Sequence, residues 1–368
     1  TMKTIPIQGQ KDKAQTVLLL CICVALSLFL QAAKFSIFPD KYFYDASIVQ
    51  GMMQENVQFG FSDSYANTAL LFQALNVLFP MNSQLWGGIV VWALALPFFI
   101  WMGLKYLKPT WEHYMLFGVY SVLLPIFVWN THKEALQFFF FLLVAVVAMC
   151  CKERSATADV LLVALLLIWC LVFRSYYLVT AAGTAFFLIL TWLPWNKWSP
   201  AYRKRLILGA ICAGIILVLL VALVKPDILV RLFDGRMNVN RTRGNDPDAN
   251  TIILDVIENP ARTIPLYIVN YVLAAFRMMF PIELIAKGVQ YVPFIVLQLC
   301  WTGLLCHAVW SASHGKWKEN WPEKRLLAVT VAWYLVAFLF EPDFGSFIRH
   351  QAAIFPVIFP VLAKGIEV

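Results

Sequence analysis

Charged residues are scarce in this sequence. Asp, Glu, Lys and Arg make up only 14% of the 368 residues, whereas 61% are hydrophobic and 15% are aromatic. A soluble domain carries about a quarter of its residues as charged side chains, because they cover its surface. The composition therefore excludes a soluble enzyme, a soluble DNA-binding domain and a disulfide-rich scaffold.

Several familiar signatures of chemistry are also absent. The sequence contains no GxxxxGK[ST] phosphate-binding loop, no GxGxxG dinucleotide fingerprint, no HExxH zinc motif and no serine-nucleophile elbow. Its eight cysteines lie in or at the ends of apolar runs, so neither a disulfide framework nor a zinc site is predicted. The net charge of +8 comes from basic residues dispersed between apolar runs, which argues against nucleic acid as a partner.

Apolar runs near ~20 residues, the length that crosses the hydrocarbon layer as a helix, are abundant. They predict an all-α polytopic membrane protein with about ten transmembrane helices. The predicted spans are 14–36, 86–104, 112–129, 134–151, 159–173, 178–194, 206–224, 290–311, 326–341 and 350–364. Two further runs, 65–80 and 264–281, are ambiguous. If both are re-entrant or interfacial, every short basic loop faces the cytoplasm, as the positive-inside rule requires.

This arrangement predicts one transmembrane domain over residues 1–368 with both termini in the cytoplasm. Residues 37–85 form a first outer loop with an interfacial helix, and residues 225–287 form an outer Arg-rich loop with a re-entrant or interfacial helix. The first apolar run resembles a signal peptide, but no cleavage site is evident and we expect it to be retained. The unusual polar residues then gather on the outer face, so an active site would face outward.

Arginines are the first candidates for chemistry, because guanidinium groups bind phosphate oxygens through paired hydrogen bonds. Arg236, Arg241 and Arg243 recur at short spacing in the loop 225–262. Arg174 follows an apolar span, where a charge is costly unless it faces water or a partner. Pairing with nearby aspartates, attraction to lipid headgroups or snorkelling to the interface explains the same arginines without a function.

The closing segment holds further candidates. Arg349 and His350 open the last span, and they supply an anion-binding charge and a proton acceptor. A solvated loop closed by a salt bridge to Glu341 or Asp343 is the alternative.

Two earlier helix starts also carry charge. Lys133 gains nothing from the helix dipole and is a second cationic candidate, whereas Glu134 in the same turn is explained by that dipole alone. Asp45, in the first outer loop, is a candidate base for a hydroxyl nucleophile, and capping by Asp40 of an interfacial helix is the alternative. Asp246 and Asp248 offer oxygen ligands for a divalent metal, although a Pro/Asp turn explains them better.

Four segments together resemble a known group of membrane enzymes. They are WNTHKEALQFFFFLL, LVFRSYYLV, RMMFPIEL and EPDFGSFIRHQAAIFPVIFPVL, with an acidic, aromatic first outer loop and the Arg-rich loop. This pattern resembles the bacterial polymerases of O-antigen, capsule and exopolysaccharide assembly, which are related in fold to the GT-C glycosyltransferases. The resemblance implies polymerisation of polyprenyl-pyrophosphate-linked oligosaccharide units on the outer face of the cytoplasmic membrane.

The resemblance also implies roles and partners. The partners would be the lipid-linked glycan, membrane lipid and a chain-length regulator protein, with no cofactor and no obligatory metal. The leaving pyrophosphate would be neutralised by Arg174, by Arg236, Arg241 and Arg243 as a group, and by Arg349, with Lys133 as an auxiliary charge. His350 is the first candidate for proton acceptor, and Asp45 is the second.

Three other interpretations stay open. The nearest is a GT-C glycosyltransferase that uses a polyprenyl-phosphate sugar and an acidic base in the first outer loop. A transporter or flippase for lipid-linked glycans is the second, although transporters commonly show internal repeats and polar residues near mid-bilayer. A non-catalytic scaffold subunit of a synthase complex is the third.

Overall fold

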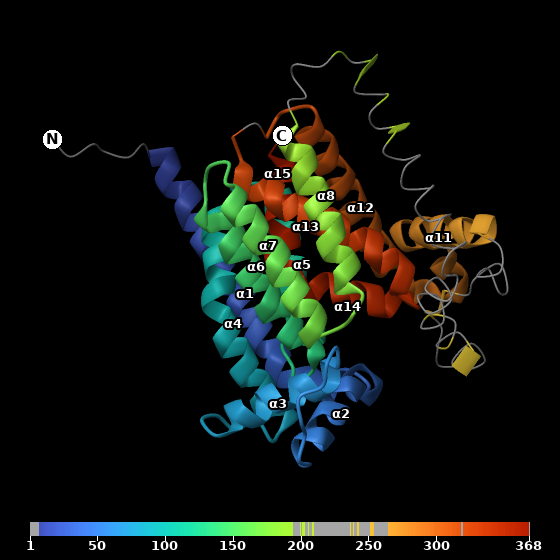
Figure 1. The fold of residues 1–368 in the computed structure, drawn as a ribbon. Helices are drawn as coiled ribbons and strands as arrows, with labels where there is room; N and C mark the ends of the chain where they lie inside the picture. Colours follow the sequence, from blue (N-terminus) through green and yellow to red (C-terminus); the bar gives the residue numbers. More distant parts are fainter. Residues whose placement is uncertain are drawn as a thin grey trace. The chain divides into compact units, whose positions relative to one another are not determined.

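The computed structural model of the chain is helical (Figure 1). It describes residues 7–193, 264–317 and 319–367, and between 194 and 263 it describes only 199, 201, 202, 205, 208, 209, 236, 238, 241, 242 and 251–253. Within these residues there is no β-strand, and an isolated bridge pairs Ile252 with Asp343. The predicted all-α class is thus confirmed for the described part of the chain.

The described residues divide into two compact units. The first unit comprises Thr1–Ala182, Leu304–Thr330 and Ile348–Val368, and the second comprises Gly183–Gly303 and Val331–Phe347. Four helices have residues in both units: α8 (Tyr177–Trp192), α12 (Val292–Ser313), α13 (Trp321–Phe340) and α14 (Phe344–Ala353). The elements wholly in the first unit are α1 (Ile7–Ile37), η1 (Asp40–Phe43), α2 (Tyr44–Met53), α3 (Ser64–Asn76), α4 (Gln84–Tyr106), α5 (Trp111–Phe127), α6 (Lys133–Cys150), α7 (Ala156–Val172) and α15 (Phe355–Ile366).

Four helical stretches in the described residues are long and apolar enough to cross a membrane. They are Lys13–Ile37, Gln84–Tyr106, Lys133–Cys150 and Val289–Ser313. A fifth crossing is added if the bent pair α14 and α15 forms one span. These helices support a membrane protein, whereas the ten predicted crossings go beyond them, and most of the predicted span 206–224 lies outside the described residues.

The predicted span 350–364 is broken in the structure. Helices α14 and α15 meet at a bend of 87° around Ile354, where one continuous helix was expected. Pro356 stands in the first turn of α15. A proline has no backbone N–H and disfavours helical geometry at the residue before it, so the chain bends here.

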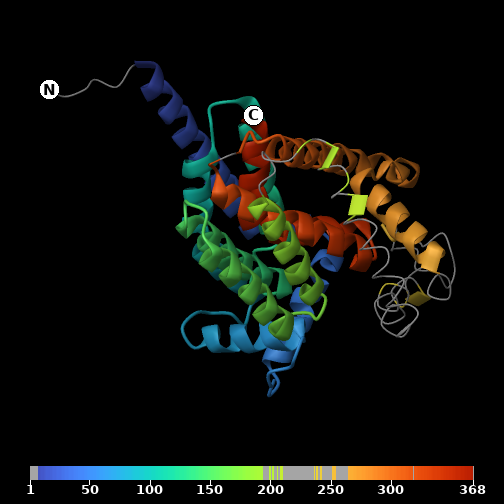
Figure 2. The same ribbon diagram turned by 45° about the horizontal axis from the view of Figure 1, so that its top comes forward.

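Helix α15 forms the centre of the first unit. Every residue from Phe355 to Ala363 is buried, and the helix packs against α4, α5 and α6 (Figures 1 and 2). Its aromatic rings contact theirs: the ring centre of Phe355 lies 6.3 Å from that of Phe138 in a parallel arrangement, and the ring centre of Phe359 lies 5.5 Å from that of Phe117 in an edge-on arrangement. Offset and edge-on ring pairs add to the energy of burying apolar area. Helix α15 thus gives α6 an aromatic packing surface.

Helices α2 and α3 gather at one end of the first unit, beneath α1 and α4 in the view of Figure 1. The Asp63 side chain begins α3 by accepting hydrogen bonds from the backbone N–H groups of Tyr65 and Ala66, both at 3.0 Å. Such a cap satisfies amides that have no partner inside the helix. With 13 residues, α3 is about 20 Å long and too short to cross the hydrocarbon layer alone.

The second unit is held by polar contacts to helix carbonyls as well as by aromatic packing. The Tyr271 hydroxyl of α11 (Ile264–Met279) donates to the Leu335 carbonyl of α13 at 2.9 Å. Between α11 and α12 the chain forms two short turns, η4 (Ile282–Lys287) and η5 (Val289–Tyr291). Trp333 and Phe347 stack with their ring centres 6.1 Å apart.

Candidate functional site

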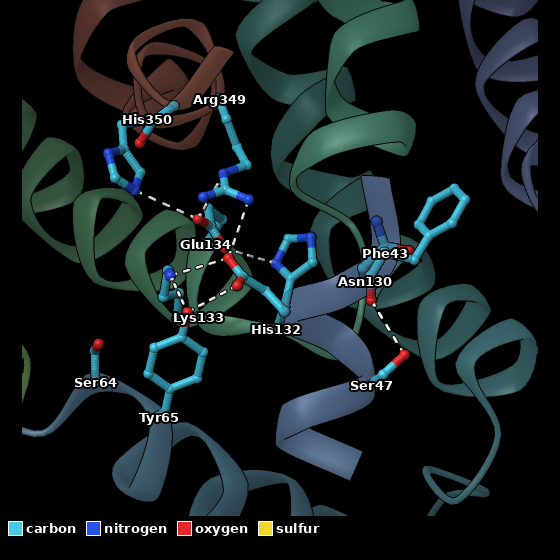
Figure 3. A network of polar contacts seen from close by, with 12 residues as sticks. Phe43, Ser47, Ser64, Tyr65, Asn130, His132, Lys133, Glu134, Arg349 and His350 are labelled. Atoms are coloured by element: carbon cyan, nitrogen blue, oxygen red, sulfur yellow. Dashed lines mark hydrogen bonds and ion pairs between the residues drawn. The ribbon is translucent and has the colours of Figure 1, made fainter. Parts of the chain in front are cut away.

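A cluster of charged side chains lies within the first unit, where α2, α3, α6 and α14 converge (Figure 3). Asp45 comes from the first turn of α2, Lys133 and Glu134 begin α6, and Arg349 lies in the second half of α14. These residues are far apart in the sequence. Only the fold brings them together, so we call Asp45, Tyr65, His132, Lys133, Glu134, Arg349 and His350 the charge cluster.

Asp45 is the first centre of the charge cluster. Its Oδ2 lies 2.9 Å from the Lys133 Nζ and 3.0 Å from the Arg349 Nη1. The Tyr65 hydroxyl donates to Asp45 Oδ1 at 2.7 Å and accepts from Lys133 Nζ at 2.6 Å. The Lys133 ammonium also lies 4.2 Å from the centre of the Tyr65 ring, within range of a cation–π interaction. One carboxylate thus holds two cations beside one aromatic ring.

Glu134 is the second centre. Its Oε1 lies 3.0 Å from the Arg349 Nε and 3.4 Å from the His350 Nε2, and its Oε2 lies 3.0 Å from the His132 Nδ1. The Arg349 Nε–H is not aligned for a hydrogen bond with Glu134, so this attraction is mainly Coulombic. Because Arg349 also contacts Asp45, its guanidinium bridges the two carboxylates.

The cluster is buried but has one open edge. The side chain of Glu134 is fully buried and that of Lys133 is 4% exposed, whereas the Arg349 side chain is 25% exposed. Two carboxylates face the amino group of Lys133 and the guanidinium of Arg349, and each histidine adds positive charge only when protonated. Taking these charges out of water is costly, and a buried ion pair is often no more stable than apolar residues of the same size. Such a cluster in an apolar protein is therefore a functional-site hypothesis by default.

Burial and neighbouring charges shift the titration of two groups outside the long apolar helices. Burial alone would raise the pKa of Asp45, and the charge of Glu134 acts in the same direction. The positive charges of Arg349 and Lys133 outweigh both effects, so the pKa of Asp45 lies below its ordinary value. Burial and the adjacent Asp45 carboxylate raise the pKa of the Tyr65 hydroxyl. Tyr65 therefore stays protonated, and its hydroxyl donates a hydrogen bond to Asp45.

Arg174 lies beside the cluster on the chain segment between α7 and α8. Its Nε lies 3.5 Å from the Ser64 hydroxyl oxygen, next to Tyr65 in α3, and its guanidinium carbon lies 5.8 Å from the centre of the Tyr176 ring. The sequence predicts a site role for Asp45, Lys133, Arg174, Arg349 and His350, and the structure brings these five into one part of the first unit. All five come from loops or helix ends that the sequence predicts on the outer side.

The structure describes two of the three candidate arginines of the predicted outer loop. Arg236 and Arg241 belong to the second unit, and Arg243 lies outside the described residues. Arg236 is buried, and its Nη1 donates to the Phe338 carbonyl at 3.2 Å, whereas Arg241 is exposed. In this arrangement Arg236 supports the end of α13.

Three members of the cluster are not singled out by the sequence: Tyr65, His132 and Glu134. A glutamate in the first turn of a helix is common because the dipole alone stabilises it. The signal that could have found Glu134 is its position beside a lysine and two residues after a histidine at the start of an apolar helix. No isolated pattern marks Tyr65.

Neither a family model, nor a curated protein, nor a solved structure matches this chain. The resemblance to polysaccharide polymerases therefore stays a prediction. In the described ranges no three His, Cys, Asp or Glu residues are placed to hold a metal ion. The metal candidates Asp246 and Asp248 lie outside those ranges.

Proposed function

We propose that this protein is a bacterial inner-membrane glycosyltransferase that polymerises oligosaccharide units carried on polyprenyl pyrophosphate, at the outer face of the membrane. The observation that carries the proposal is the convergence of Asp45, Lys133, Glu134 and Arg349 in a partly open cluster. Lys133, Glu134 and Arg349 lie in the sequence segments that resemble such polymerases, and Asp45 lies in the acidic first outer loop. A diphosphate headgroup at the membrane surface needs cations, and its tail needs an apolar path. The charge cluster would supply the cations, and the apolar helices would supply the path.

The cations in the resting cluster are already neutralised by carboxylates. A diphosphate that approaches the open edge meets Arg349 first, because this is the most exposed side chain among the ion-paired residues of the cluster. Phosphate oxygens accept the same paired N–H groups that a carboxylate accepts. We therefore expect the headgroup to replace Asp45 on Arg349, with Lys133 close enough to share the charge.

The replacement also prepares a base. Once Asp45 loses part of its cationic contact, its affinity for a proton rises. In the transfer step the acceptor hydroxyl oxygen bonds to the anomeric carbon of the donor, and its proton passes to His350 or to Asp45. The bond between that carbon and the phosphate oxygen breaks, and the pyrophosphate leaves with the electron pair. Arginine and lysine placed where this negative charge develops would lower the barrier.

The test is the pattern of lipid-linked glycans in a deletion strain complemented with variants. Arg349→Ala and Glu134→Gln should leave single, unpolymerised repeat units on the outer leaflet, while the wild-type gene restores a ladder. Arg154→Ala is the matched control, because Arg154 is exposed on a predicted inner loop and stacks on Trp321. Immunoblots of membranes show whether each variant is present.

Ladders of normal length from Arg349→Ala would overturn the proposal. Accumulation of single units on the inner leaflet in the deletion strain would instead identify a flippase. If neither the deletion nor any variant alters the glycans, the polymerase assignment fails entirely.

One observation favours the GT-C glycosyltransferase that uses a polyprenyl-phosphate sugar. Asp45, the acidic residue of the first predicted outer loop, lies inside the charge cluster, whereas Asp40 is exposed. Loss of activity in Asp45→Ala, with activity retained in both Arg349→Ala and Asp40→Ala, would select that enzyme over the polymerase.

A further inference from the structure

The turn that carries the cluster into α6 is itself buried. Residues 128–132, between α5 and α6, are all below the surface, and they end at Lys133 and Glu134. Connecting segments normally run over a protein surface, because their backbone polar groups need partners. The carbonyls of Val128, Asn130 and His132 accept backbone N–H groups within this segment, whereas the Trp129 carbonyl accepts only side-chain donors among the described contacts of the turn.

Lys34 of α1 supplies the missing donors. Its side chain is fully buried, and its Nζ donates to the carbonyls of Pro125 and Trp129, both at 3.1 Å, and to the Asn130 Oδ1. The Asn130 amide is fixed by its own donation to the Ile126 carbonyl at 3.0 Å. An ammonium group has three N–H donors, and all three find acceptors at the end of α5 or in the turn.

Two further contacts close this arrangement. The Gln31 Nε2, one helical turn before Lys34, donates to the same Trp129 carbonyl at 2.8 Å. Gly88 of α4 lies against the group: a Cβ there would collide with Gln31 Nε2 and lie 3.3 Å from Lys34 Nζ. Glycine is therefore needed at this position for α1, α4 and the turn to approach so closely.

We infer that Lys34 is a positioning residue, which fixes the α5–α6 turn so that Lys133 and Glu134 meet Asp45 and Arg349. The cation lies at the carboxyl end of α5, where the helix dipole favours positive charge. Burying a cation among neutral acceptors costs desolvation free energy, and an apolar side chain at this position would pack without that cost. In the described part of the chain, the hydrogen bonds of Lys34 go to Pro125, Trp129 and Asn130 and none goes to a residue of the cluster, so Lys34 acts through the turn.

Hydrogen exchange measured by mass spectrometry tests the positioning role directly, on the full-length protein in detergent or nanodiscs. In Lys34→Met, the amides of residues 126–136 should exchange about ten- to a hundredfold faster, while peptides from α7 stay as in wild type. Lys34→Arg keeps a donor cation and should retain most of the protection. Unchanged protection of residues 126–136 in Lys34→Met would overturn the inference.

Gly88→Ala gives an independent probe if Lys34→Met does not fold. The added methyl group displaces Gln31 and Lys34, so the same peptide should lose protection. Gly118→Ala in α5 is the matched control, because a Cβ there meets nothing within 4 Å. Equal exchange in the two alanine variants would contradict a role for this contact.

The consequence for turnover rests on the proposed function and is measured separately. With a lipid-linked donor, Lys34→Met should lower kcat and raise the KM, because Lys133, which shares the charge of the bound diphosphate, and Glu134 leave their places beside Asp45 and Arg349. Lys34→Arg should restore most of both constants. A wild-type protein without polymerase activity would refute the proposed function and leave the exchange result standing. Faster exchange at 126–136 with unchanged kcat would overturn the link from the turn to the site.

Discussion

At the scale of single residues, the charge balance around Asp45 decides how the cluster responds to pH. Asp45 is held by Lys133 and Arg349, and its pKa lies below the ordinary value because these positive charges outweigh the opposite effects of burial and of Glu134. A carboxylate whose pKa is lower in the folded state stabilises the fold above its ordinary pKa. This contribution disappears as the pH falls through the folded-state value.

We predict that the Asp45 contribution to stability is complete above about pH 5 and declines as the pH falls below about pH 4, the ordinary aspartate pKa, toward the lower folded-state pKa. In thermal unfolding of the purified protein, Asp45→Asn should lower the Tm between about pH 5 and 7, and the difference from wild type should shrink in acid. Asp40→Asn, at an exposed aspartate, serves as the control. A Tm difference that grows as the pH falls would contradict the ion pairing.

The residue scale also shows what a sequence can and cannot reveal. Arg349, Lys133 and Asp45 are predictable as unusual charges, since each stands in a predicted outer loop or at the start of a predicted span, beside apolar residues. The central role of Glu134 is not predictable from its surroundings, because the dipole of its own helix explains a glutamate there. Its partners Arg349 and His350 come from the far end of the chain, and only the tertiary fold places them.

At the scale of elements, α6 is held at both ends. Its first turn carries the cluster, and the residues that directly follow its last turn are held by Arg325 of α13. The Arg325 Nε lies 2.7 Å from Asp159 Oδ1 of α7, and its Nη1 and Nη2 donate to the carbonyls of Cys151 at 2.5 Å and of Glu153 at 2.7 Å. The guanidinium thus closes the connection between α6 and α7, and it is almost completely buried.

We predict that Arg325→Met lowers the free energy of unfolding by about 3–5 kcal/mol, because Asp159 loses its buried partner. The double variant with Asp159→Asn should recover part of this loss, since the uncompensated charge is removed. Lys324→Met is the control, because its half-buried ammonium lies over the Trp321 ring. Unfolding of the solubilised protein by denaturant measures all three, and equal effects of Arg325→Met and Lys324→Met would refute the assignment.

The elements also mark where sequence patterns are insufficient. Apolar length identifies α1, α4, α6 and α12, because hydrophobicity over about 20 residues is a property of the segment alone. The bend between α14 and α15 depends in addition on Pro356 and on the space that α4, α5 and α6 leave for α15. Pro356 is visible in the sequence, but the direction of the bend follows from packing.

At the scale of the whole molecule, the membrane topology remains the prediction on which the outward-facing site depends. The segment after α2 is predicted to lie on the outer side of the membrane, and it contains the exposed residue Glu55. The connection between α6 and α7 is predicted to lie on the cytoplasmic side, and it contains the exposed residue Glu153. A single cysteine at either position reports its side of the membrane, once the eight native cysteines are replaced.

In intact cells, a membrane-impermeant maleimide should label Glu55→Cys and should label Glu153→Cys only after permeabilisation. Both sites lie apart from the ion pairs of the cluster, so the variants should fold normally. The opposite labelling pattern would place the charge cluster on the cytoplasmic side and remove the proposed reaction from the outer face.

The most direct measurement of the central claim is binding of polyprenyl pyrophosphate to the purified protein, by native mass spectrometry or calorimetry. Arg349→Met should raise the Kd by about ten- to a hundredfold, the loss expected for charge-assisted hydrogen bonds, while Arg154→Met should bind as wild type. If wild type and Arg349→Met bind the diphosphate lipid equally, the charge cluster is not its binding site.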